Sequence, residues 1–365
     1  MRFFDKMVNG MIERGYDAEF AQRCFKQIEG FGTYGFPESH AASFALLVYA
    51  SAWLKCHYPE VFTCALLNAQ PMGFYSPAQL IADAQRSGVE VRPVDINYSA
   101  WDSTLELVPQ ARHALRLGLR LVKGLNAVEA ARITACRSES YQSVEDIITR
   151  SDISAKTIEL IAAADGLRSL GLNARQGFWQ ARKQGRLQMN KLPLFAQADN
   201  RTKIIKQDDD SYLKLPPSLF GEQIAQDYTA TGLSLKGHPV DSLKAWFEKD
   251  RWQGCSAIDE APNGRRLRLI GLVTMRQRPG TAKGTVFVTI EDSLLSVNVI
   301  VWPHIVERDR TALLGAHLMG VYGRLQRQGP ITHFIAESVH NCDSYLGFLH
   351  ASDQQAPRLK SRDFH

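Results

Sequence analysis

The sequence predicts a multidomain α+β protein. Its N-terminal two-thirds are expected to be mainly helical, and a five-stranded β-barrel of the OB type is expected to follow. Three observations lead to this prediction. The chain has 365 residues, enough for about two to four domains. Apolar residues recur at helical spacing in the first part of the chain, and they alternate with polar residues between 265 and 343.

The composition excludes several classes of protein. With 45% hydrophobic and 22% charged residues, the chain is neither disordered nor collagen-like. Its six cysteines form no Cys-x-x-Cys pair, which argues against a disulfide framework or a zinc site and favours a reducing cytosol. The N-terminus lacks the apolar segment of a signal peptide, and no apolar stretch reaches the ~20 residues of a membrane span. We therefore expect a cytoplasmic protein.

The first 110 residues are expected to form helices and then a mixed, turn-rich connector. Residues 1–70 carry the helical spacing, and one helix is predicted from Ser39 to Tyr58, with Pro59 as its stop signal. Ser39 is interpreted as an N-cap and His40 as a packed neighbour of nearby aromatic rings. The alternative is that both contact a nucleotide phosphate. Residues 71–110 form the connector, with a short strand pair predicted at VEVRPVDIN.

Residues 111–186 are predicted to form a DNA-binding module of two helix-hairpin-helix motifs. The region 112–191 contains 14 Lys and Arg against 7 Asp and Glu, although such a surface is often only a solvated helix face. Within it, Val122–Ile133 reads VKGLNAVEAARI, a tight turn that opens a helix. Backbone N–H groups at such a turn bind a DNA phosphate without reading the base sequence.

Two copies of this motif are predicted. The first supplies four candidate contacts to duplex DNA, Lys123, Gly124, Asn126 and Arg132. Asn126 replaces the second glycine of the motif and is expected to adopt the same left-handed conformation. The second copy, at 162–175, adds Arg175. An ordinary helix cap is the structural alternative for the first copy, and a helix-turn-helix packing unit is the alternative for the second.

Residues 187–262 are predicted to be a linker followed by a helical connector. The linker combines prolines, few large apolar residues and three aspartates at 208–210, which are interpreted as a solvated turn rather than a metal site. The sequence also contains no nucleophile triad, no phosphate-binding Gly-rich loop and no carboxylate pair that could hold two Mg²⁺ ions on a sheet. No catalytic residue and no metal site are therefore predicted in this chain.

The barrel is predicted at 263–345, with a flexible tail at 346–365. Alternating residues indicate its strands, and a helix is expected between the third and fourth strands. A basic surface with exposed aromatic rings would bind single-stranded DNA. The residues predicted for that surface are Arg265, Arg266, Arg268, Arg276, Phe287 and Tyr322. The alternative is that the aromatic rings fill the barrel core.

Two segments resemble a known family. Gly30–Asn68 resembles the end of the fingers domain of bacterial C-family DNA polymerases, the type of the replicative alpha subunit. The run after Asn68, and Pro37-Glu38 where replicative enzymes carry Asn-Lys, are similar to the error-prone, damage-inducible branch. Asp227–Pro239, DYTATGLSLKGHP, resembles the family's connector before its OB domain. The order of domains extends the resemblance over nearly the whole chain, and residues 1–70 would be the end of the fingers.

The resemblance implies a translesion polymerase that extends a primer by template-directed nucleotidyl transfer, with Mg²⁺ as a cofactor of the full-length enzyme. It also implies that the palm and its catalytic aspartates lie upstream of this sequence. The chain is then expected to be the DNA-binding C-terminal portion, without a bound metal of its own. Ser39 and His40 lie in the family's fingers motif, which makes contact with the incoming nucleotide as good an expectation as capping.

Further partners follow from the same resemblance. Lys191–Phe195, KLPLF, is similar to the sliding-clamp peptide of replicative relatives, but Lys replaces the leading Gln, so weak clamp binding is expected. The alternative is an apolar clip for the linker. An inactive Y-family polymerase homologue is expected to dock on the C-terminal region. The alternative function for the whole chain is a stand-alone, non-catalytic DNA-binding or repair-assembly module.

Overall fold

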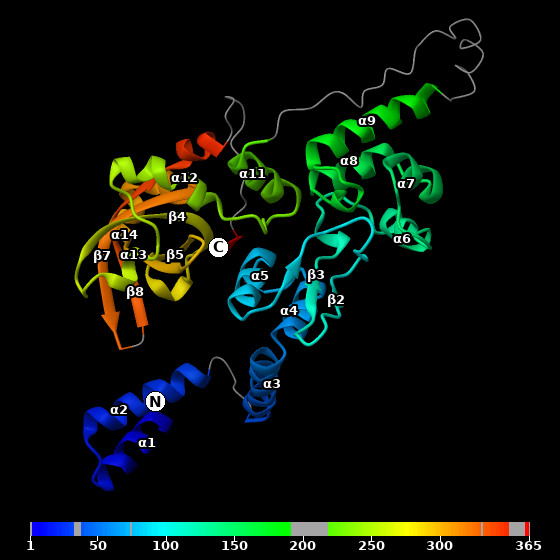
Figure 1. Ribbon diagram of the computed structural model, residues 1–365. Helices are drawn as coiled ribbons and strands as arrows, with labels where there is room; N and C mark the ends of the chain where they lie inside the picture. The colour runs from blue at the N-terminus through cyan, green and yellow to red at the C-terminus, as the bar shows by residue number, and fades with distance from the viewer. Residues whose placement is uncertain are drawn as a thin grey trace, which may run out of the picture. The chain divides into compact units, whose positions relative to one another are not determined.

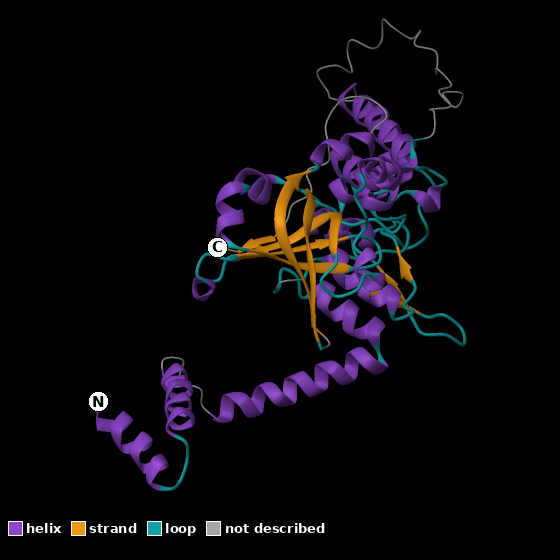
Figure 2. Ribbon diagram, turned by 90° about the vertical axis from the view of Figure 1, so that its left-hand side faces the viewer, coloured by secondary structure: helices purple, strands orange, loops and turns teal. Residues whose placement is uncertain are grey.

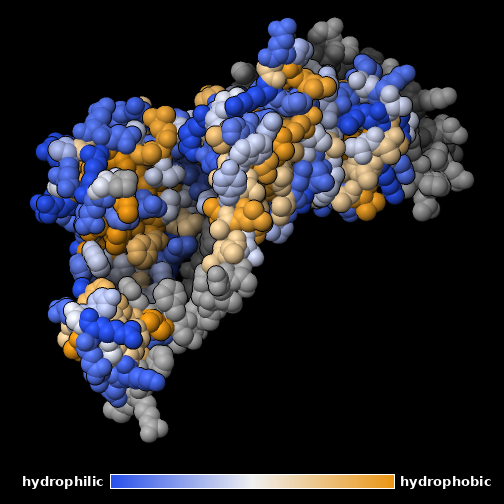
Figure 3. All heavy atoms as spheres, turned by 90° about the horizontal axis from the view of Figure 1, so that it is seen from below, coloured by the Kyte–Doolittle hydropathy of each residue, from blue (hydrophilic) through white to orange (hydrophobic). Residues whose placement is uncertain are grey.

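The computed structural model describes residues 2–32, 38–73, 75–190, 218–329, 331–349 and 362–364 (Figure 1). The chain divides into two compact units, residues 1–62 and residues 63–365. None of the helices in these described ranges has the length and hydrophobicity that a bilayer crossing requires. The surface seen in Figure 3 mixes hydrophilic side chains with separate hydrophobic patches.

The first unit is helical, as predicted. Its elements are α1 (Arg2–Glu13), α2 (Ala18–Gly32), α3 (Glu38–His57) and the beginning of α4 (Pro59–Asn68). The rings of Phe4 and Phe25 meet edge to face, with centroids 4.8 Å apart, and join α1 to α2. Pro59 follows the end of α3 and is also the first residue of α4, a position where its missing N–H costs nothing.

A small sheet opens the second unit. β1 (Val91–Arg92) runs parallel to β3 (Ala114–Arg116), and β2 (Thr104–Glu106) pairs antiparallel with β3. The strand pair predicted at VEVRPVDIN is therefore wrong, because only Val91 and Arg92 are in a strand there. Pro93 ends that strand, since proline lacks the N–H that the next ladder hydrogen bond would need.

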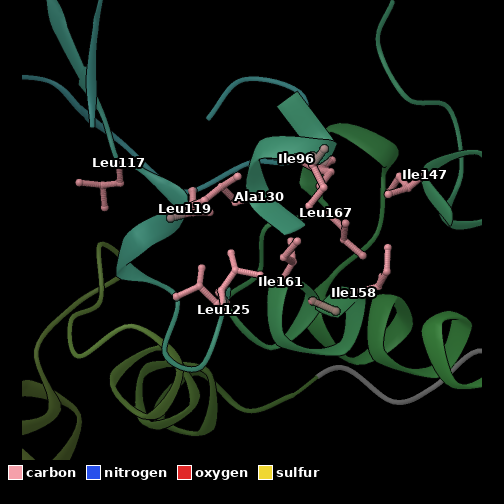
Figure 4. Close-up of a cluster of buried hydrophobic side chains, with 14 of the residues drawn as sticks. Ile96, Leu117, Leu119, Leu125, Ala130, Ile147, Ile158, Ile161 and Leu167 are labelled. Atoms are coloured by element: carbon pink, nitrogen blue, oxygen red, sulfur yellow. The ribbon is translucent and has the colours of Figure 1, made fainter. Parts of the chain in front are cut away.

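Helices before and after this sheet in the chain share one buried core with it and form the hairpin module. They are α5 (Pro77–Arg86), α6 (Ala127–Ala135), α7 (Val144–Ser151), α8 (Ala155–Ala163) and α9 (Ala174–Asn190), with single 3-10 turns η1 (Leu119–Leu121) and η2 (Arg168–Leu170). Ser143 and Ser154 cap α7 and α8 by accepting hydrogen bonds from backbone N–H groups. Figure 4 shows the shared core, in which Leu125 and Ile161 are buried together with Ile96. The segment predicted as a connector, 71–110, therefore packs as part of this module.

The helical connector is described from residue 218. It contains α11 (Phe220–Ala230), α12 (Pro239–Phe247), the 3-10 turn η5 (Glu248–Asp250) and the short helix α13 (Ala257–Glu260). Leu233 is buried in the core of the hairpin module, whereas Ala225 is buried with residues of the barrel side. The connector is thus packed against both of its neighbours in the chain.

The C-terminal region is a closed five-stranded barrel, as predicted (Figure 2). Its strands are β4 (Arg266–Gln277), β5 (Val286–Glu291), β6 (Ser296–Val301), β7 (Leu318–Gln328) and β8 (Ile331–Asn341), and the 3-10 turn η6 (Gly280–Ala282) follows β4. The order β5-β6-β8-β7-β4 closes because β4 also pairs with β5. β6 and β8 are parallel and the other neighbouring strands are antiparallel. The helices α14 (Pro303–Arg308) and α15 (Arg310–Gly315) separate the third and fourth strands, which is the OB arrangement.

The first residues of the region predicted as a flexible tail are ordered against the connector. The 3-10 helix η7 (Asp343–Leu349) buries Leu346 and Leu349 in the cluster that contains Phe247 of α12. The prediction of a flexible tail from 346 is therefore wrong for these residues, because their apolar side chains have a partner surface. A short strand, β9 (Arg362–Phe364), pairs with β4, and residues 350–361 lie outside the described part.

Candidate nucleic-acid interface

The first hairpin contains a tight turn, Gly124–Ala127, here called the first GLNA turn. Gly124 has a φ of +82°, a left-handed conformation that glycine adopts at low cost. Asn126 has a φ of −90°, so the prediction that it shares this conformation is wrong. Asn126 is instead the N-cap of α6, because its side-chain oxygen accepts the N–H of Val128 at 2.8 Å.

The second hairpin repeats this turn at Gly171–Ala174, the second GLNA turn. Gly171 has a φ of +72°. The side-chain oxygen of Asn173 accepts the N–H of Gln176 at 2.9 Å, and the side chain of Gln176 accepts the N–H of Asn173 at 3.1 Å. This reciprocal pair is a capping box at the start of α9. The two turns therefore share both sequence and local geometry.

A small residue in the following helix completes each hairpin. Ala130 in α6 and Gly177 in α9 occupy equivalent positions, and both are buried. A Cβ atom at Gly177 would lie 2.8 Å from Cδ1 of Leu167 and 3.1 Å from Cβ of Ala162. The absence of a side chain at this position therefore allows α9 to approach the end of α8 closely.

Both turns present a helix N-terminus to solvent. Gly124, Asn126 and Ala127 are exposed, as are Gly171 and Asn173. The first N–H groups of a helix have no acceptor within the helix, and the helix dipole adds a partial positive charge there. Such an arrangement is chemically suited to bind a phosphate oxygen.

The basic side chains near the turns have protein partners. Nζ of Lys123 donates hydrogen bonds to the carbonyl oxygens of Tyr228 and Thr229, at 2.7 and 2.9 Å. Arg132 is exposed and donates to the carbonyl of Asp152 at 3.2 Å. Arg175 forms a loose ion pair with Glu222, with a closest N–O distance of 3.4 Å.

On the barrel, three of the predicted residues come together. Arg268 on β4 is directly opposite Tyr322 on β7, and Arg266 is directly opposite Arg324. The guanidinium of Arg268 lies over the ring of Trp252, 4.4 Å from its centroid. Arg265 is exposed just before β4. We call Arg266, Arg268, Tyr322 and Arg324 the arginine face.

The pair Arg266–Arg324 indicates what this face can bind. Like charges directly opposite each other on neighbouring strands are destabilising unless something compensates them. Arg266 forms an ion pair with Glu337 at 2.9 Å, and Arg324 donates to the carbonyl of Gly264 at 3.1 Å. The face keeps an excess of positive charge, which suits an anionic ligand. Sequence reasoning missed Arg324, although it lies two residues after Tyr322 and so on the same side of β7.

Phe287 does not belong to the arginine face. Its ring is 37% exposed on β5, where it is opposite Gln277, near the end of β4. Arg268 lies nine residues earlier on that strand, about 30 Å away along an extended backbone. The single aromatic and basic surface predicted from the sequence is therefore two surfaces. Tyr322 is half-buried, so its ring is less accessible than predicted.

Arg276 is not on the surface at all. It is 6% exposed, its Nε donates to the carbonyl of Leu313 at 2.7 Å, and the carbonyl of Ala316 accepts a further hydrogen bond. The pairing of β4 with β5 shifts register between Val273 and Met275. Such a shift reverses the direction of the side chains that follow it. The prediction that Arg276 contacts DNA is therefore wrong.

The remaining candidates cannot be placed in the same way. Ser39 and His40 are the second and third residues of α3, which begins at Glu38, but their side chains lie outside the described part of the structure. The whole of Lys191–Phe195 also lies outside it. Among the described residues, no group of three or more His, Cys, Asp or Glu side chains could hold a metal ion. The Mg²⁺ that the resemblance implies for a full-length enzyme has no ligand set there, so we assign no catalytic step to these residues.

Comparisons with known proteins match the hairpin region and, over most of the chain, polymerase sequences. A family model described as a helix-hairpin-helix motif matches residues 88–177. The chain is 46% identical over 356 residues to Error-prone DNA polymerase 2 of Rhizobium meliloti, covering 96% of this chain and 32% of that protein. It is 44% identical over 355 residues to an Error-prone DNA polymerase of Brucella abortus, covering 97% of this chain and 32% of that protein. The chain thus spans about a third of the length of these relatives.

Part of the chain is similar to a solved structure. An asparaginyl-tRNA synthetase from Pyrococcus horikoshii matches 25% of this chain and 22% of its own length, with 21% identity and a TM-score of 0.22. A likeness at that level carries no argument about fold or function.

Proposed function

This chain belongs to the error-prone DNA polymerases, as a C-terminal portion of such a protein, and we propose that it holds the DNA while the polymerase copies a damaged template. The observation that carries the proposal is the pair of GLNA turns. Each turn places a glycine with positive φ next to a capped and exposed helix N-terminus. Two such turns in one module suit two phosphates of a duplex.

The duplex is proposed to contact the two GLNA turns through backbone N–H groups. Gly124 and Asn126 belong to the first turn, and Arg132 on α6 adds positive charge on an exposed surface. Arg175 lies in the first turn of α9, next to the second GLNA turn. Because these contacts are made to phosphates, we expect them to be independent of base sequence.

The single-stranded template is proposed to follow the arginine face. Its arginines would neutralise phosphates, and the ring of Tyr322 offers a partial stacking surface. Phe287 lies on a different part of the barrel and would contact single-stranded DNA only if the strand wraps further around β5.

Helix α3 supports a role within a larger polymerase. Seven of its large apolar side chains are at least 38% exposed: Phe44, Leu46, Leu47, Val48, Tyr49, Trp53 and Leu54. A helix that is apolar on all sides is normally buried. We propose that the remainder of the polymerase covers α3 and supplies the palm with its Mg²⁺ ions, and that Ser39 and His40 contact the incoming nucleotide there. A stand-alone DNA-binding module, the alternative function, offers no such cover.

We also propose two protein partners and a cellular compartment for the complete enzyme. Lys191–Phe195 would bind a sliding clamp weakly, and an inactive Y-family polymerase homologue would dock on the C-terminal region. The complete enzyme would act in the cytoplasm, at the bacterial nucleoid.

Binding of duplex DNA should weaken steeply as salt rises. With about four phosphates neutralised, the logarithm of the association constant should fall with a slope of about −3 to −5 against the logarithm of salt concentration. The loss between 50 and 200 mM salt is then about 100-fold. Fluorescence anisotropy with two duplexes of unrelated sequence measures this, and their affinities should agree within about threefold. A flat salt dependence, or a strong preference for one sequence, would count against backbone recognition.

A further inference from the structure

Hydrogen bonds from Lys123 join the first GLNA turn to the connector. The backbone N–H of Lys123 donates to the carbonyl of Ala230 at 2.8 Å, while its Nζ donates to the carbonyls of Tyr228 and Thr229. These three carbonyls form the last turn of α11, where a helix has unpaired acceptors and a partial negative charge. Lys123 therefore holds a helix end with the same donors that it would offer to a phosphate.

A second set of ion pairs joins the connector to the hairpin module. Nζ of Lys236, in the connector, is 3.0 Å from a carboxylate oxygen of Asp165 and 2.8 Å from one of Asp227. Asp165 follows α8 and also pairs with Arg168. The Lys236 side chain is 18% exposed, and those of Asp165 and Asp227 are 9% and 13% exposed. This network is nearly closed to solvent, which makes it hard to open.

The connector is also packed against the barrel. Ala225 of α11 is buried in one cluster with Ile270 of β4 and with Leu346 and Leu349 of η7. A Cβ atom at Gly221 would lie 3.2 Å from Cδ2 of Leu349, so the approach is close. Because α11 contacts the hairpin module on one side and the barrel on the other, it sets the spacing between the two proposed DNA-binding surfaces.

We propose that Lys123 and Lys236 are positioning residues that hold the hairpin module and the arginine face at a fixed spacing, so that the chain prefers a duplex with a single-stranded extension over either form alone. This inference rests on the proposed function, in which the hairpins take the duplex and the barrel takes the single strand. Two surfaces on one rigid body bind the two parts of a junction with a high effective concentration. A flexible connection between the hairpin module and the barrel lowers that effective concentration without changing either binding surface.

The test compares Lys123→Met with Lys156→Met. Lys156 is an exposed lysine on α8 that forms no hydrogen bond or ion pair with the described residues of α11, so its replacement removes the same charge from the same module and keeps the bonds to α11. Three DNA probes are used: a blunt duplex, a single strand, and a duplex with a single-stranded 5′ extension. We expect wild type to bind the junction at least about 50-fold more tightly than the blunt duplex. Lys123→Met should weaken junction binding about tenfold, while its effect on the other two probes equals that of Lys156→Met.

Further outcomes separate this inference from the proposed function. Lys123→Arg, which keeps a donor to the α11 carbonyls, should restore junction binding to within about twofold of wild type. If Lys123→Met weakens all three probes equally and beyond Lys156→Met, Lys123 is a phosphate ligand and the inference is overturned. An unchanged junction preference in Lys123→Met overturns it as well. If wild type binds neither the duplex nor the single strand, the proposed function fails, and this inference fails with it.

Discussion

Lys236→Met is expected to lower the free energy of unfolding by about 3–5 kcal/mol at neutral pH. The ammonium of Lys236 lies between the carboxylates of Asp165 and Asp227, whose side chains are 9% and 13% exposed. Removing it leaves two nearly buried negative charges close together, and only Arg168 remains to compensate Asp165. Methionine keeps the length of the aliphatic stem, so the loss reports the charge rather than a cavity. Urea denaturation at pH 7 measures this difference.

The effect should depend on pH with a definite sign. Burial raises the pKa of Asp227 above its ordinary value of 3.8, although Lys236 lowers it in part. A carboxyl with a raised pKa binds its proton more tightly when folded. It therefore stabilises the fold most below pH 3.8, and this contribution is lost as the pH rises through the raised pKa. Without Lys236 that pKa rises further, so the destabilisation should shrink as the pH falls from 7 towards 4.

A matched variant controls for the loss of a lysine. The side chain of Lys244 on α12 is 67% exposed, and its Nζ lies 3.8 Å from Oε1 of Glu248. An exposed ion pair of this kind contributes little to the free energy of unfolding. Lys244→Met should change the free energy of unfolding by less than about 0.5 kcal/mol. Equal losses for the two variants, or a Lys236→Met effect that is constant with pH, would show that the carboxylates are not the cause.

Gly118→Ala is expected to lower the free energy of unfolding by about 3 kcal/mol, the second large effect. A Cβ atom at Gly118 would lie 2.4 Å from the carbonyl carbon of Asp102 and 2.5 Å from the N of Ser103. Both are backbone atoms, so no flexible side chain can move aside. The φ of Gly118 is −79°, which any residue adopts, so close approach and not conformation requires glycine here. Thermal unfolding followed by circular dichroism measures the change.

Gly315→Ala is the control for this substitution. Gly315 is the last residue of α15 and has open space where a Cβ would be. Alanine there should be neutral or slightly stabilising, by up to about 1 kcal/mol, because it restricts the unfolded chain. If Gly118→Ala melts at the same temperature as Gly315→Ala, the contact between Gly118 and residues 101–103 is not as tight as the structure indicates.

Local sequence patterns predicted the architecture well. The alternation at Val286–Ile290 and Val297–Val301 marks two barrel strands, and the helix expected before the fourth strand is present as α14 and α15. The left-handed Gly124 was also predictable, since few residues other than glycine adopt that conformation at low cost. These features depend on residues close together in the chain.

Other features could not be predicted from local patterns in the sequence. The side chain of Lys123 donates a hydrogen bond to the carbonyl of Tyr228, which is 105 positions away in the chain. No local sequence pattern predicts that contact. Arg276 follows the outward alternation of β4 until a register shift turns it inward, and that shift is set by pairing with β5. The left-handed conformation of Asn126 was predicted because asparagine tolerates that region of backbone space. Its side chain instead caps α6 by accepting the N–H of Val128. Side-chain orientation and partners thus required the tertiary structure.

Hydrogen–deuterium exchange with and without a duplex tests the central claim most directly, because it reports on backbone N–H groups at both GLNA turns. We predict that saturating duplex slows exchange in peptides covering 123–128 and 171–176, with little change in peptides from α12. Protection at both turns would match two phosphate contacts made by the backbone. Saturated duplex binding without protection at either turn would contradict the account.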